Sequence, residues 1–390
     1  MNDKPAKPSV DFPLYPHRNG QWAKKIRGKT KFFGVWANPA DALAKYLDEK
    51  DDLQAGREVR RGEGTTIADL ADEWLDDQRA RVQSKELALR TWGDYRRTAQ
   101  TVVDILGPDT PADSIKPSDF QRVRERLTKG RGVHALRREI THVRMMFTWG
   151  FESELLPVQV RFGPSFKQPG KRAMKRHRNE QEKKLIAAEH IRQLLPVADV
   201  KMRAMILLGI NCGFGNTDVA TLPRRALLYV DGHAFLDFPR PKTGEERRCP
   251  LWPETELMLR LAMTVRVVPK DPADAGLVFL TRTGARYVRV KETEVEDGDS
   301  KITNIDIVAQ TFKKLLKGRE FDRRGLNFYV LRHTFETIAG DSADQVATDF
   351  MMGHSDQSMA ATYREKIFEH RLLKVAEHVR HWLLPNVSPA

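Results

Sequence analysis

The sequence predicts a multidomain protein that is mainly α-helical and carries small β elements. Its 390 residues exceed the size of about 300 residues at which a single hydrophobic core usually stops growing, so two or three domains are expected. Apolar residues recur at helical spacing through most of the chain. Short alternating runs bounded by turn residues occur near the N-terminus and again in the C-terminal half, which predicts small sheets at both places.

The composition indicates a polyanionic partner. Lys and Arg number 66 against 53 Asp and Glu, and the sequence pI is about 9.7. Charge alone does not distinguish DNA from RNA or an acidic membrane surface. The longest apolar run, residues 204–210, is far shorter than the roughly 20 residues of a membrane-spanning helix, and the opening MNDKPAKPSV has no signal-peptide core. A cytoplasmic protein that does not enter a membrane is therefore expected.

The sequence contains two cysteines. Cys212 and Cys249 provide neither a disulfide framework nor a zinc cluster, so no structural metal is expected.

Residues 10–61 predict a β-meander, NGQWAKKIRGKTKFFGVW, followed by one helix after Asn38 and Pro39. Its basic residues could line a strand face that enters a DNA groove, with a solvated face as the alternative; they are Lys24, Lys25, Arg27, Lys29 and Lys31.

Residues 65–157 predict a module of four helices, because each segment repeats apolar residues at i, i+3 and i+4. Trp74, Trp92, Phe147 and Trp149 have core-compatible spacing and are interpreted as packing residues. Several arginines lie beside small polar residues, as a phosphate-binding face requires, and an ordinary solvated face is the alternative. These arginines are Arg90, Arg96, Arg97, Arg137, Arg138 and Arg144.

Residues 158–184 predict an extended basic linker, because Pro, Gly and a cluster of cations replace the apolar pattern. Its cations include Lys171, Arg172, Lys175 and Arg176. Such a linker would let two DNA-contacting domains close round a duplex as a clamp; a flexible tether with incidental charge is the alternative.

Residues 185–385 predict a mixed α+β domain that begins with helices, turns to short strands and returns to helices. Lys242 falls in Pro-Lys-Thr-Gly between two strand-like runs, and a lysine near a hairpin tip can reach into a groove. A lone lysine is usually surface charge. The final segment, FEHRLLKVAEHVRHWLL, predicts an amphipathic helix that docks either on a neighbouring protomer or on its own domain.

The segment FYVLRHTFETIAGDSADQVATDFMMGHSDQSMAATYREKI carries the specific motifs. Arg332 precedes His354 by 22 residues, and Tyr363 follows His354 after 9 more. In order and spacing, Leu-Arg-His-Thr-Phe, Met-Gly-His-Ser and Ala-Thr-Tyr-Arg resemble the C-terminal signature of the tyrosine recombinase (phage integrase) family. The helical module, the basic linker and the N-terminal meander also resemble that family's core-binding domain, interdomain connection and arm-site-binding domain. The resemblance covers nearly the whole chain, and the last third carries its specific motifs.

The resemblance implies a chemistry that suits these residue types. A phosphodiester reacts only when its non-bridging oxygens are neutralised and its leaving oxygen is protonated. Arg332 would donate to two phosphate oxygens, and His354 would donate a further hydrogen bond. Tyr363 would be the nucleophile that forms a 3′-phosphotyrosyl intermediate, and Lys242 would protonate the leaving 5′-oxygen. Because the bond energy is conserved, the family needs neither ATP nor a metal, so no cofactor is expected.

Two positions depart from the family pattern. Gly215, in Cys-Gly-Phe-Gly-Asn-Thr-Asp, occupies the place of the first catalytic arginine. Its loss could cost about 3–4 kcal/mol of transition-state stabilisation, by analogy with an oxyanion-hole donor. Tyr329 replaces a histidine and would act as a hydrogen-bond donor. A substitute arginine is expected from Arg203, Arg224 or Arg225, with the adjacent pair slightly favoured.

These departures define a rival hypothesis, a DNA-binding protein on a recombinase scaffold that has lost or greatly slowed strand cleavage. Retention of Lys242, Arg332, His354 and Tyr363 together argues against it. A metal-dependent nuclease is a third interpretation, disfavoured because no carboxylate cluster has two-metal spacing. The partners implied are double-stranded DNA, further copies of the chain in a tetramer on paired sites, and DNA-bending accessory proteins. The implied process is DNA integration or recombination of a mobile element, with the protein on the nucleoid when DNA-bound.

Overall fold

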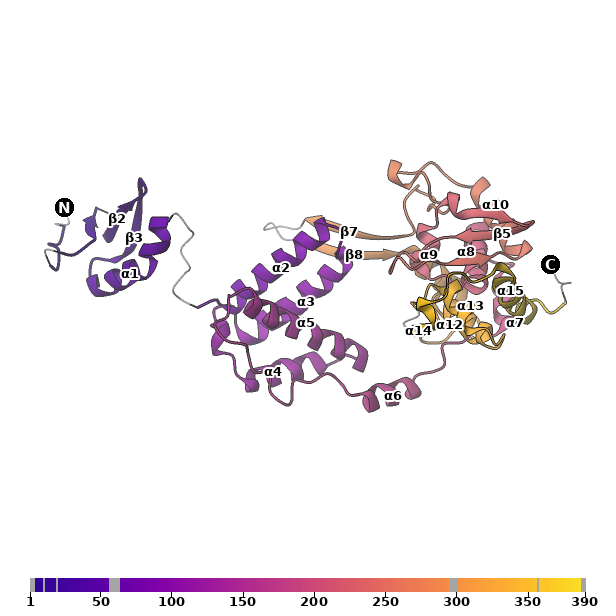
Figure 1. The fold of residues 1–390 in the computed structure, drawn as a ribbon, viewed down its shortest axis with the longest axis horizontal. Helices are drawn as coiled ribbons and strands as arrows, with labels where there is room; N and C mark the ends of the chain where they lie inside the picture. The colour runs from indigo at the N-terminus through magenta and orange to yellow at the C-terminus, as the bar shows by residue number, and fades with distance from the viewer. Residues whose placement is uncertain are drawn as a thin grey trace. The chain divides into compact units, whose positions relative to one another are not determined.

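The computed structural model describes residues 4–9, 11–18, 20–55, 64–294, 300–355 and 358–386 (Figure 1). The chain divides into two compact units, Met1–Arg178 and Asn179–Ala390. Helices predominate and the described sheets have two or three strands. The predicted class, mainly helical with small β elements, is confirmed.

The first unit begins with an antiparallel three-stranded sheet in the order β1-β2-β3, followed by α1. The strands and helix are β1 (Tyr15–His17), β2 (Gln21–Ile26), β3 (Lys29–Val35) and α1 (Pro39–Ala55). Trp22 and Phe33 from the sheet pack with Tyr46 of α1 in a small core. The meander and helix therefore form where the alternating pattern and the Asn-Pro signal predicted them.

A helical module follows, with the four main helices α2 (Ile67–Gln83), α3 (Leu89–Leu106), α4 (Pro117–Thr128) and α5 (Val133–Glu152), and a short η1 (Ala112–Ser114). Thr66 caps α2 by accepting from the Asp69 backbone N–H, and the Asp69 carboxylate accepts from the Thr66 N–H in return. Trp74 and Phe147 are buried in the core of this module. Their interpretation as packing residues is confirmed.

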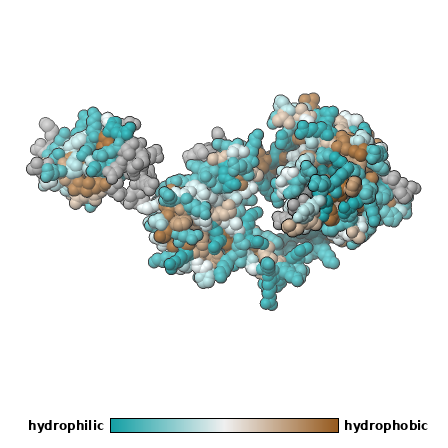
Figure 2. Space-filling model, in the orientation of Figure 1, coloured by the Kyte–Doolittle hydropathy of each residue, from teal (hydrophilic) through white to brown (hydrophobic). Residues whose placement is uncertain are grey.

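The segment after α5 corrects the prediction of an extended linker. Phe162 and Phe166 return to the module and pack on Phe120, with ring centroids 4.7 and 5.3 Å from its ring. Beyond them, α6 (Lys171–Glu180) is helical, and its surface is hydrophilic with no buried residue (Figure 2). The low apolar content indicated a coil, but Lys, Arg, Ala and Met are strong helix formers that need no apolar face to form a solvated helix.

The second unit is built round the buried helix α8, which contacts α9, α10, α11, α12 and α15. Its helices are α7 (Ala188–Leu194), α8 (Val200–Asn211), α9 (Asn216–Thr221), α10 (Pro253–Thr264), α11 (Ile307–Leu316), α12 (Val330–Gly340), α13 (Gln345–Met352), α14 (Met359–Thr362) and α15 (Glu369–Leu383). The short helices are η2 (Arg224–Ala226) and η3 (Pro272–Asp274). Apolar residues at nearly every position of α8 explain why this helix lies at the centre of the core.

The described part of this unit contains two sheets. The first is antiparallel in the order β4-β5-β6 and consists of β4 (Leu227–Val230), β5 (His233–Asp237) and β6 (Arg248–Pro250). The second is the hairpin of β7 (Val288–Glu294) and β8 (Ser300–Asp306). Lys242 lies in the turn between β5 and β6, as predicted for a residue near a hairpin tip.

The C-terminal helix α15 docks on its own domain, which decides between the two predicted placements. Leu372, Val375 and Val379 are buried in the core of the second unit. Trp252 Nε1 donates to the Ala376 carbonyl at 2.8 Å, and Arg380 pairs with Glu254 at 2.8 Å. Among the described residues, no helix has the length and apolarity to cross a membrane.

Replacing Phe166 by alanine is expected to destabilise the helical module by about 3–5 kcal/mol, because it leaves a cavity beside two aromatic rings. Amide hydrogen exchange on the full chain should show faster exchange in α4 and α5. Val158→Ala is the matched control, since that side chain is 62% exposed and its loss should stay within about 0.5 kcal/mol. Equal effects of the two changes would mean that residues 158–168 do not belong to the module core.

Candidate active site

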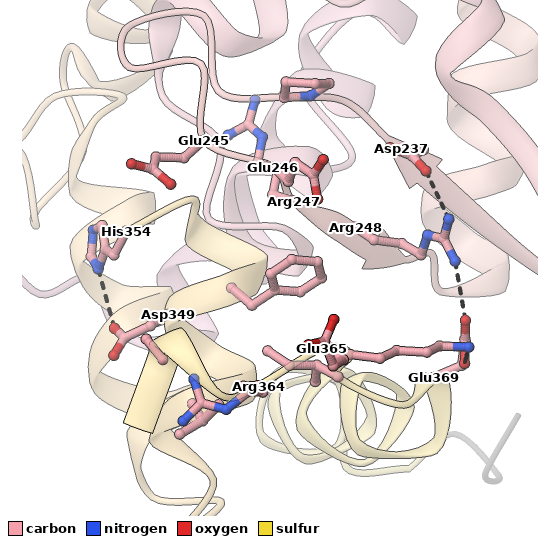
Figure 3. Close-up of a pocket in the computed structure, with 16 residues that line it drawn as sticks. Asp237, Glu245, Glu246, Arg247, Arg248, Asp349, His354, Arg364, Glu365 and Glu369 are labelled. Atoms are coloured by element: carbon pink, nitrogen blue, oxygen red, sulfur yellow. Dashed lines mark hydrogen bonds and ion pairs between the residues drawn. The ribbon is translucent and has the colours of Figure 1, made fainter. Parts of the chain in front are cut away.

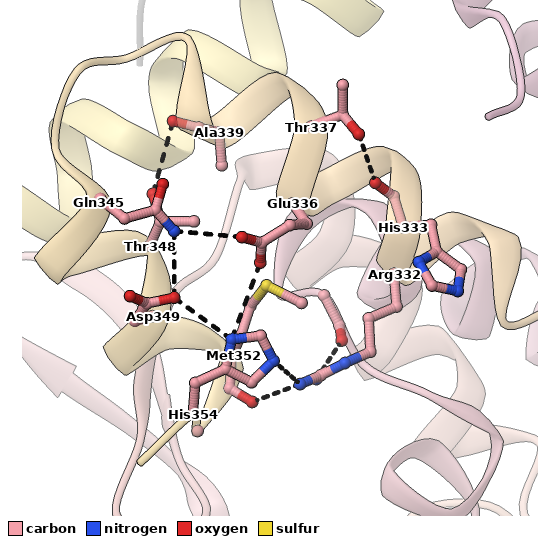
Figure 4. Close-up of polar contacts among 12 residues, drawn as sticks. Arg332, His333, Glu336, Thr337, Ala339, Gln345, Thr348, Asp349, Met352 and His354 are labelled. Carbon is pink, nitrogen blue, oxygen red and sulfur yellow. Dashed lines mark hydrogen bonds and ion pairs between the residues drawn. The ribbon is translucent and has the colours of Figure 1, made fainter. Parts of the chain in front are cut away.

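Arg332 is held inside the second unit by α12. Its neighbours Leu331 and Phe335 are fully buried, which fixes the helix, and Arg332 itself is only 3% exposed. One terminal nitrogen donates to the Gly213 carbonyl at 2.7 Å, and the other donates to the Met352 carbonyl at 2.8 Å (Figure 4). The side chain therefore joins the end of α8 to the end of α13.

His354 lies beside Arg332 because α13 ends at Gly353. Gly353 has a φ of 62°, in the left-handed region that favours glycine, and it turns the chain so that His354 folds back. The His354 Nε2 atom is 3.0 Å from Arg332 Nη2, and Nδ1 is 3.2 Å from the Asp349 carboxylate. A guanidinium cannot accept a hydrogen bond, so Nε2 accepts from Arg332 and Nδ1 carries the proton.

Glu336, Asp349 and His354 form the one group of potential metal ligands found in the described part of the chain. Their ligand atoms lie within 4.8 Å of one another, and Gln345 donates to both carboxylates (Figure 4). Sequence spacing did not indicate this group, because its members come from α12, α13 and the turn after α13. With Nε2 bound to Arg332, the two carboxylates can orient His354 and offset the nearby positive charge.

The two departures from the family pattern contact each other. A Cβ atom on Gly215 would lie 2.9 Å from the ring of Tyr329, closer than real Cβ contacts allow. The Gly215 N–H donates to the Asp218 carboxylate at 2.7 Å, which fixes the loop that opens α9. An arginine at position 215 is thus incompatible with the present position of the Tyr329 ring.

Arg247 is buried beneath this loop. It is 1% exposed, pairs with Asp218 at 3.0 Å and donates through Nε to the Phe238 carbonyl at 2.7 Å. Its guanidinium carbon lies 4.0 Å from the centre of the Phe214 ring. Its Nη1 atom is buried without a hydrogen bond in the described structure. These contacts give Arg247 a scaffolding role for the loop at Gly215.

Arg240 extends from the β5–β6 loop to the turn at Gly353, which precedes His354. Its Nη1 atom donates to the Gly353 carbonyl at 3.2 Å, and its side chain packs against Gly353, which has no Cβ to obstruct it. Burial lowers the pKa of Arg332 from its ordinary value, the positive charges of Arg240 and then Arg247 lower this pKa further, and Tyr329 and Asp218 oppose the change. Sequence analysis missed both arginines, although both flank Lys242 in RPKTGEERR.

Lys242 and Tyr363 are not brought to the Arg332–His354 pair in this state. Both are exposed, and the described contacts include no hydrogen bond or ion pair that joins either residue to Arg332 or His354. Tyr363 is 78% exposed and follows the last residue of α14. The helix α14 is a single turn, and Tyr363 is the residue that caps its C-terminal end.

A cavity of about 760 Å³ separates the β5–β6 loop from the segment that carries Tyr363 (Figure 3). Ala361 and Arg364, on either side of the tyrosine, line this cavity, as does His354. Arg248 closes one end by bonding Asp237 at 2.8 Å and Glu369 at 3.1 Å. The cavity thus lies between His354 and the segment that carries Tyr363.

The expected substitutes for the missing arginine lie elsewhere. Arg203 is in the first turn of α8 and donates to the Pro196 and Ala198 carbonyls, whereas Gly215 follows the opposite end of that helix. Arg203 and Asn211 are eight positions apart in the helix, a rise of about 12 Å. Arg224 and Arg225 are exposed in η2, and neither has a described contact with Arg332. Proximity to Gly215 in the sequence therefore did not identify an arginine that lies near Arg332.

The predicted DNA-binding cations are distributed over several surfaces. Lys24 lies over the Tyr46 ring of α1, and Arg27 donates to the Gln54 carbonyl, so they face the helix, while Lys25 is exposed. The single basic strand face is thus corrected; the Lys29 side chain lies outside the described part. In the helical module Arg96 lies near Trp92, Arg97 and Arg138 pair with Asp94, and Arg137 binds Gln168. The predicted cations Lys171, Arg172, Lys175 and Arg176 are exposed on α6, as is Arg178.

Comparison with known proteins identifies the fold. No protein-family model matches the chain, and no curated protein matches its sequence. Among solved structures, a lambda integrase dimer bound to a COC′ core site matches with a TM-score of 0.54 and 14% identity, covering 92% of this chain and 97% of that one. A lambda integrase tetramer bound to a Holliday junction gives 0.54 and 14%, covering 93% and 98%.

A third solved structure gives a similar result. The Tn1549 transposon integrase in complex with a circular intermediate DNA matches with a TM-score of 0.55 and 16% identity, covering 79% of this chain and 98% of that one. These matches define a multidomain integrase architecture. The chain has the tyrosine recombinase fold, as the sequence resemblance implied.

Gly215→Ala is expected to destabilise the second unit by about 1–3 kcal/mol, because the added methyl group overlaps the Tyr329 ring. In a Tyr329→Ala background this penalty should disappear, giving a coupling free energy of about 1 kcal/mol or more in thermal unfolding. Tyr329 is 40% exposed, so its own truncation should be tolerated. Additive effects of the two substitutions would contradict the contact.

Proposed function

We propose that this protein is a site-specific DNA recombinase or integrase that cuts and rejoins DNA strands through a 3′-phosphotyrosyl intermediate. The observation that carries the proposal is the Arg332–His354 pair, held at 3.0 Å in a chain with the tyrosine recombinase fold. Tyr363 follows nine residues after His354 on an exposed segment, as a mobile nucleophile requires. The reaction needs neither a metal nor ATP.

The chemistry assigns one task to each residue. Arg332 uses three of the five N–H groups of its guanidinium on Gly213, Met352 and His354, and the others can bind a non-bridging phosphate oxygen. By resemblance to the family, His354 lies beside the same phosphate, and the Asp349 carboxylate, 3.2 Å from Nδ1, orients its ring. Tyr329 supplies a further hydroxyl donor close to Arg332.

In the cleavage step, the phenol of Tyr363 loses its proton to solvent, its oxygen forms a bond to phosphorus, and the bond to the 5′-oxygen breaks. Lys242 gives its proton to the departing oxygen, which leaves as a 5′-hydroxyl. Both residues must move to reach the phosphate, and both lie on exposed segments beside the same cavity-lining elements. A 5′-hydroxyl from the partner strand reverses the attack and completes the exchange.

DNA binding is assigned to four regions of the chain. We assign residues 10–61 to an arm-type DNA-binding domain, 65–157 with the segment packed on it through Phe166 to a core-binding domain, the rest of 158–184 to the basic connection and 185–385 to the catalytic domain. Lys25 and the Lys and Arg residues of α6 have exposed side chains that can face phosphates. The solved neighbours include a DNA-bound dimer and a tetramer. By analogy, a tetramer on paired sites, aided by DNA-bending proteins, carries out the exchange in the cytoplasm on nucleoid DNA.

The alternative function is DNA binding on the same scaffold with lost or greatly slowed cleavage. Gly215 favours it, because the position contributes no guanidinium to the phosphate site. Covalent adduct formation separates the two functions, since a protein that only binds leaves the phosphodiester intact.

Wild-type protein is expected to form a denaturation-resistant adduct with a nicked duplex that carries the candidate attachment junction from the DNA flanking its own gene, in the presence of EDTA. Tyr363→Phe should bind this duplex equally well and form no adduct, because it lacks the attacking oxygen. Tyr229→Phe, at another exposed tyrosine of the same unit, should retain adduct formation. Tight binding without an adduct across several junctions would support the cleavage-deficient alternative, and an adduct abolished by EDTA would indicate metal dependence.

Lys242→Ala is expected to slow cleavage by about 10²–10⁴-fold, the usual contribution of a general acid. A substrate with sulfur in place of the bridging 5′-oxygen should restore near wild-type cleavage, because a thiolate leaves without a proton. Lys317→Ala, another exposed lysine of this unit, serves as the control on both substrates. An equal loss for Lys242→Ala on both substrates would assign Lys242 to DNA binding instead.

A further inference from the structure

The loop that opens α9 contributes no cation of its own to the Arg332 site. Gly215 has no side chain, and the Tyr329 ring occupies the space where one would begin. A scissile phosphate carries its charge on two non-bridging oxygens, and Arg332 already commits three N–H groups to the protein. A second guanidinium from another element would complete the neutralisation.

Arg240 has the geometry for this role. It donates to the Gly353 carbonyl at 3.2 Å, while Arg332 donates to the Met352 carbonyl at 2.8 Å. Two guanidinium groups are thus anchored to consecutive carbonyls of one turn, directly before His354. Arg240 is half-buried, so its remaining N–H groups can reach a bound phosphate.

The other nearby arginines are committed to different contacts. Arg247 is 1% exposed and holds Asp218 and the Phe238 carbonyl, so it cannot reach a phosphate without breaking the loop. Arg248 is paired with both Asp237 and Glu369. The side chain of Arg240 makes its one described hydrogen bond to a neutral carbonyl, and no described ion pair joins its charge to a carboxylate.

We propose that Arg240 binds the scissile phosphate together with Arg332 and replaces the guanidinium missing at Gly215. This inference rests on the proposed recombinase function. Arg240 and Lys242 share the β5–β6 loop, so one loop delivers both a charge-neutralising group and the general acid to the same phosphate. Arg247 acts as a positioning residue that ties the base of this loop to Asp218.

The test compares Arg240→Ala and Arg240→Lys with wild type on nicked duplexes, read as the rate of strand cleavage. Arg319→Ala is the matched control, because Arg319 is also half-buried and donates to one carbonyl, that of Leu315 at 2.8 Å. Two substrates are used, an ordinary phosphate and a neutral methylphosphonate at the position that the wild type cleaves. Thermal unfolding and DNA binding of each variant are measured in parallel.

On ordinary DNA, Arg240→Ala should cleave about 100-fold or more slowly than wild type, as expected for loss of one transition-state donor. On the methylphosphonate, which carries no negative charge, the difference should shrink to a few-fold. Arg240→Lys should fall between alanine and wild type, because it keeps the charge and loses the planar fork. Arg319→Ala should cleave both substrates at the wild-type rate.

Cleavage of ordinary DNA by Arg240→Ala at the wild-type rate would overturn the inference. An equal loss on both substrates would also overturn it, because a purely structural role does not depend on phosphate charge. In either case an active wild type leaves the proposed function intact. A wild type that cleaves no junction would instead refute the proposed function, and the role of Arg240 with it.

Discussion

The burial of the Arg332 guanidinium constrains the rest of the second unit. A charged group that is 3% exposed is tolerated only when it is hydrogen-bonded, and here two backbone carbonyls and one imidazole nitrogen accept from three of its five N–H groups. Gly213 and Met352 must present their carbonyls at the same point, so α8 and α13 must end there. The position of His354 follows from the same turn.

The cations of the site are redistributed rather than lost. Tyr329 fills the space beside Gly215, Asp218 ties the Gly215 N–H to Arg247, and the β5–β6 loop brings Arg240 to the carbonyl next to His354. Each of these contacts depends on another, which explains why the two sequence departures occur together. A single substitution at either position would therefore leave a clash or a gap in the loop that supports Arg332.

The sequence predicted those features that depend on local patterns. Helical spacing located the four-helix module, turn signals placed Lys242 at a hairpin tip, and ordered motifs selected Arg332 and His354, which the structure brings together. Features that depend on tertiary contacts were missed. Phe162 and Phe166 return to a core formed by earlier helices, and Arg240 reaches the site only through the sheet fold. Tyr363 was identified by its motif alone. Its exposed position, without a described contact to Arg332 or His354, depends on the fold of the segment after His354, which the local sequence pattern does not determine.

The ion pairs of Arg248 have a kinetic consequence. They hold Glu369 against the β5–β6 region. Tyr363 lies six positions before Glu369, so the connecting segment spans at most about 20 Å when fully extended. A reactant held this way has a high local concentration at any phosphate within reach and essentially none beyond it. Under the proposed function, this length limits the volume in which the Tyr363 hydroxyl can meet a phosphate, so DNA bound outside that volume would stay uncut however tightly it is bound.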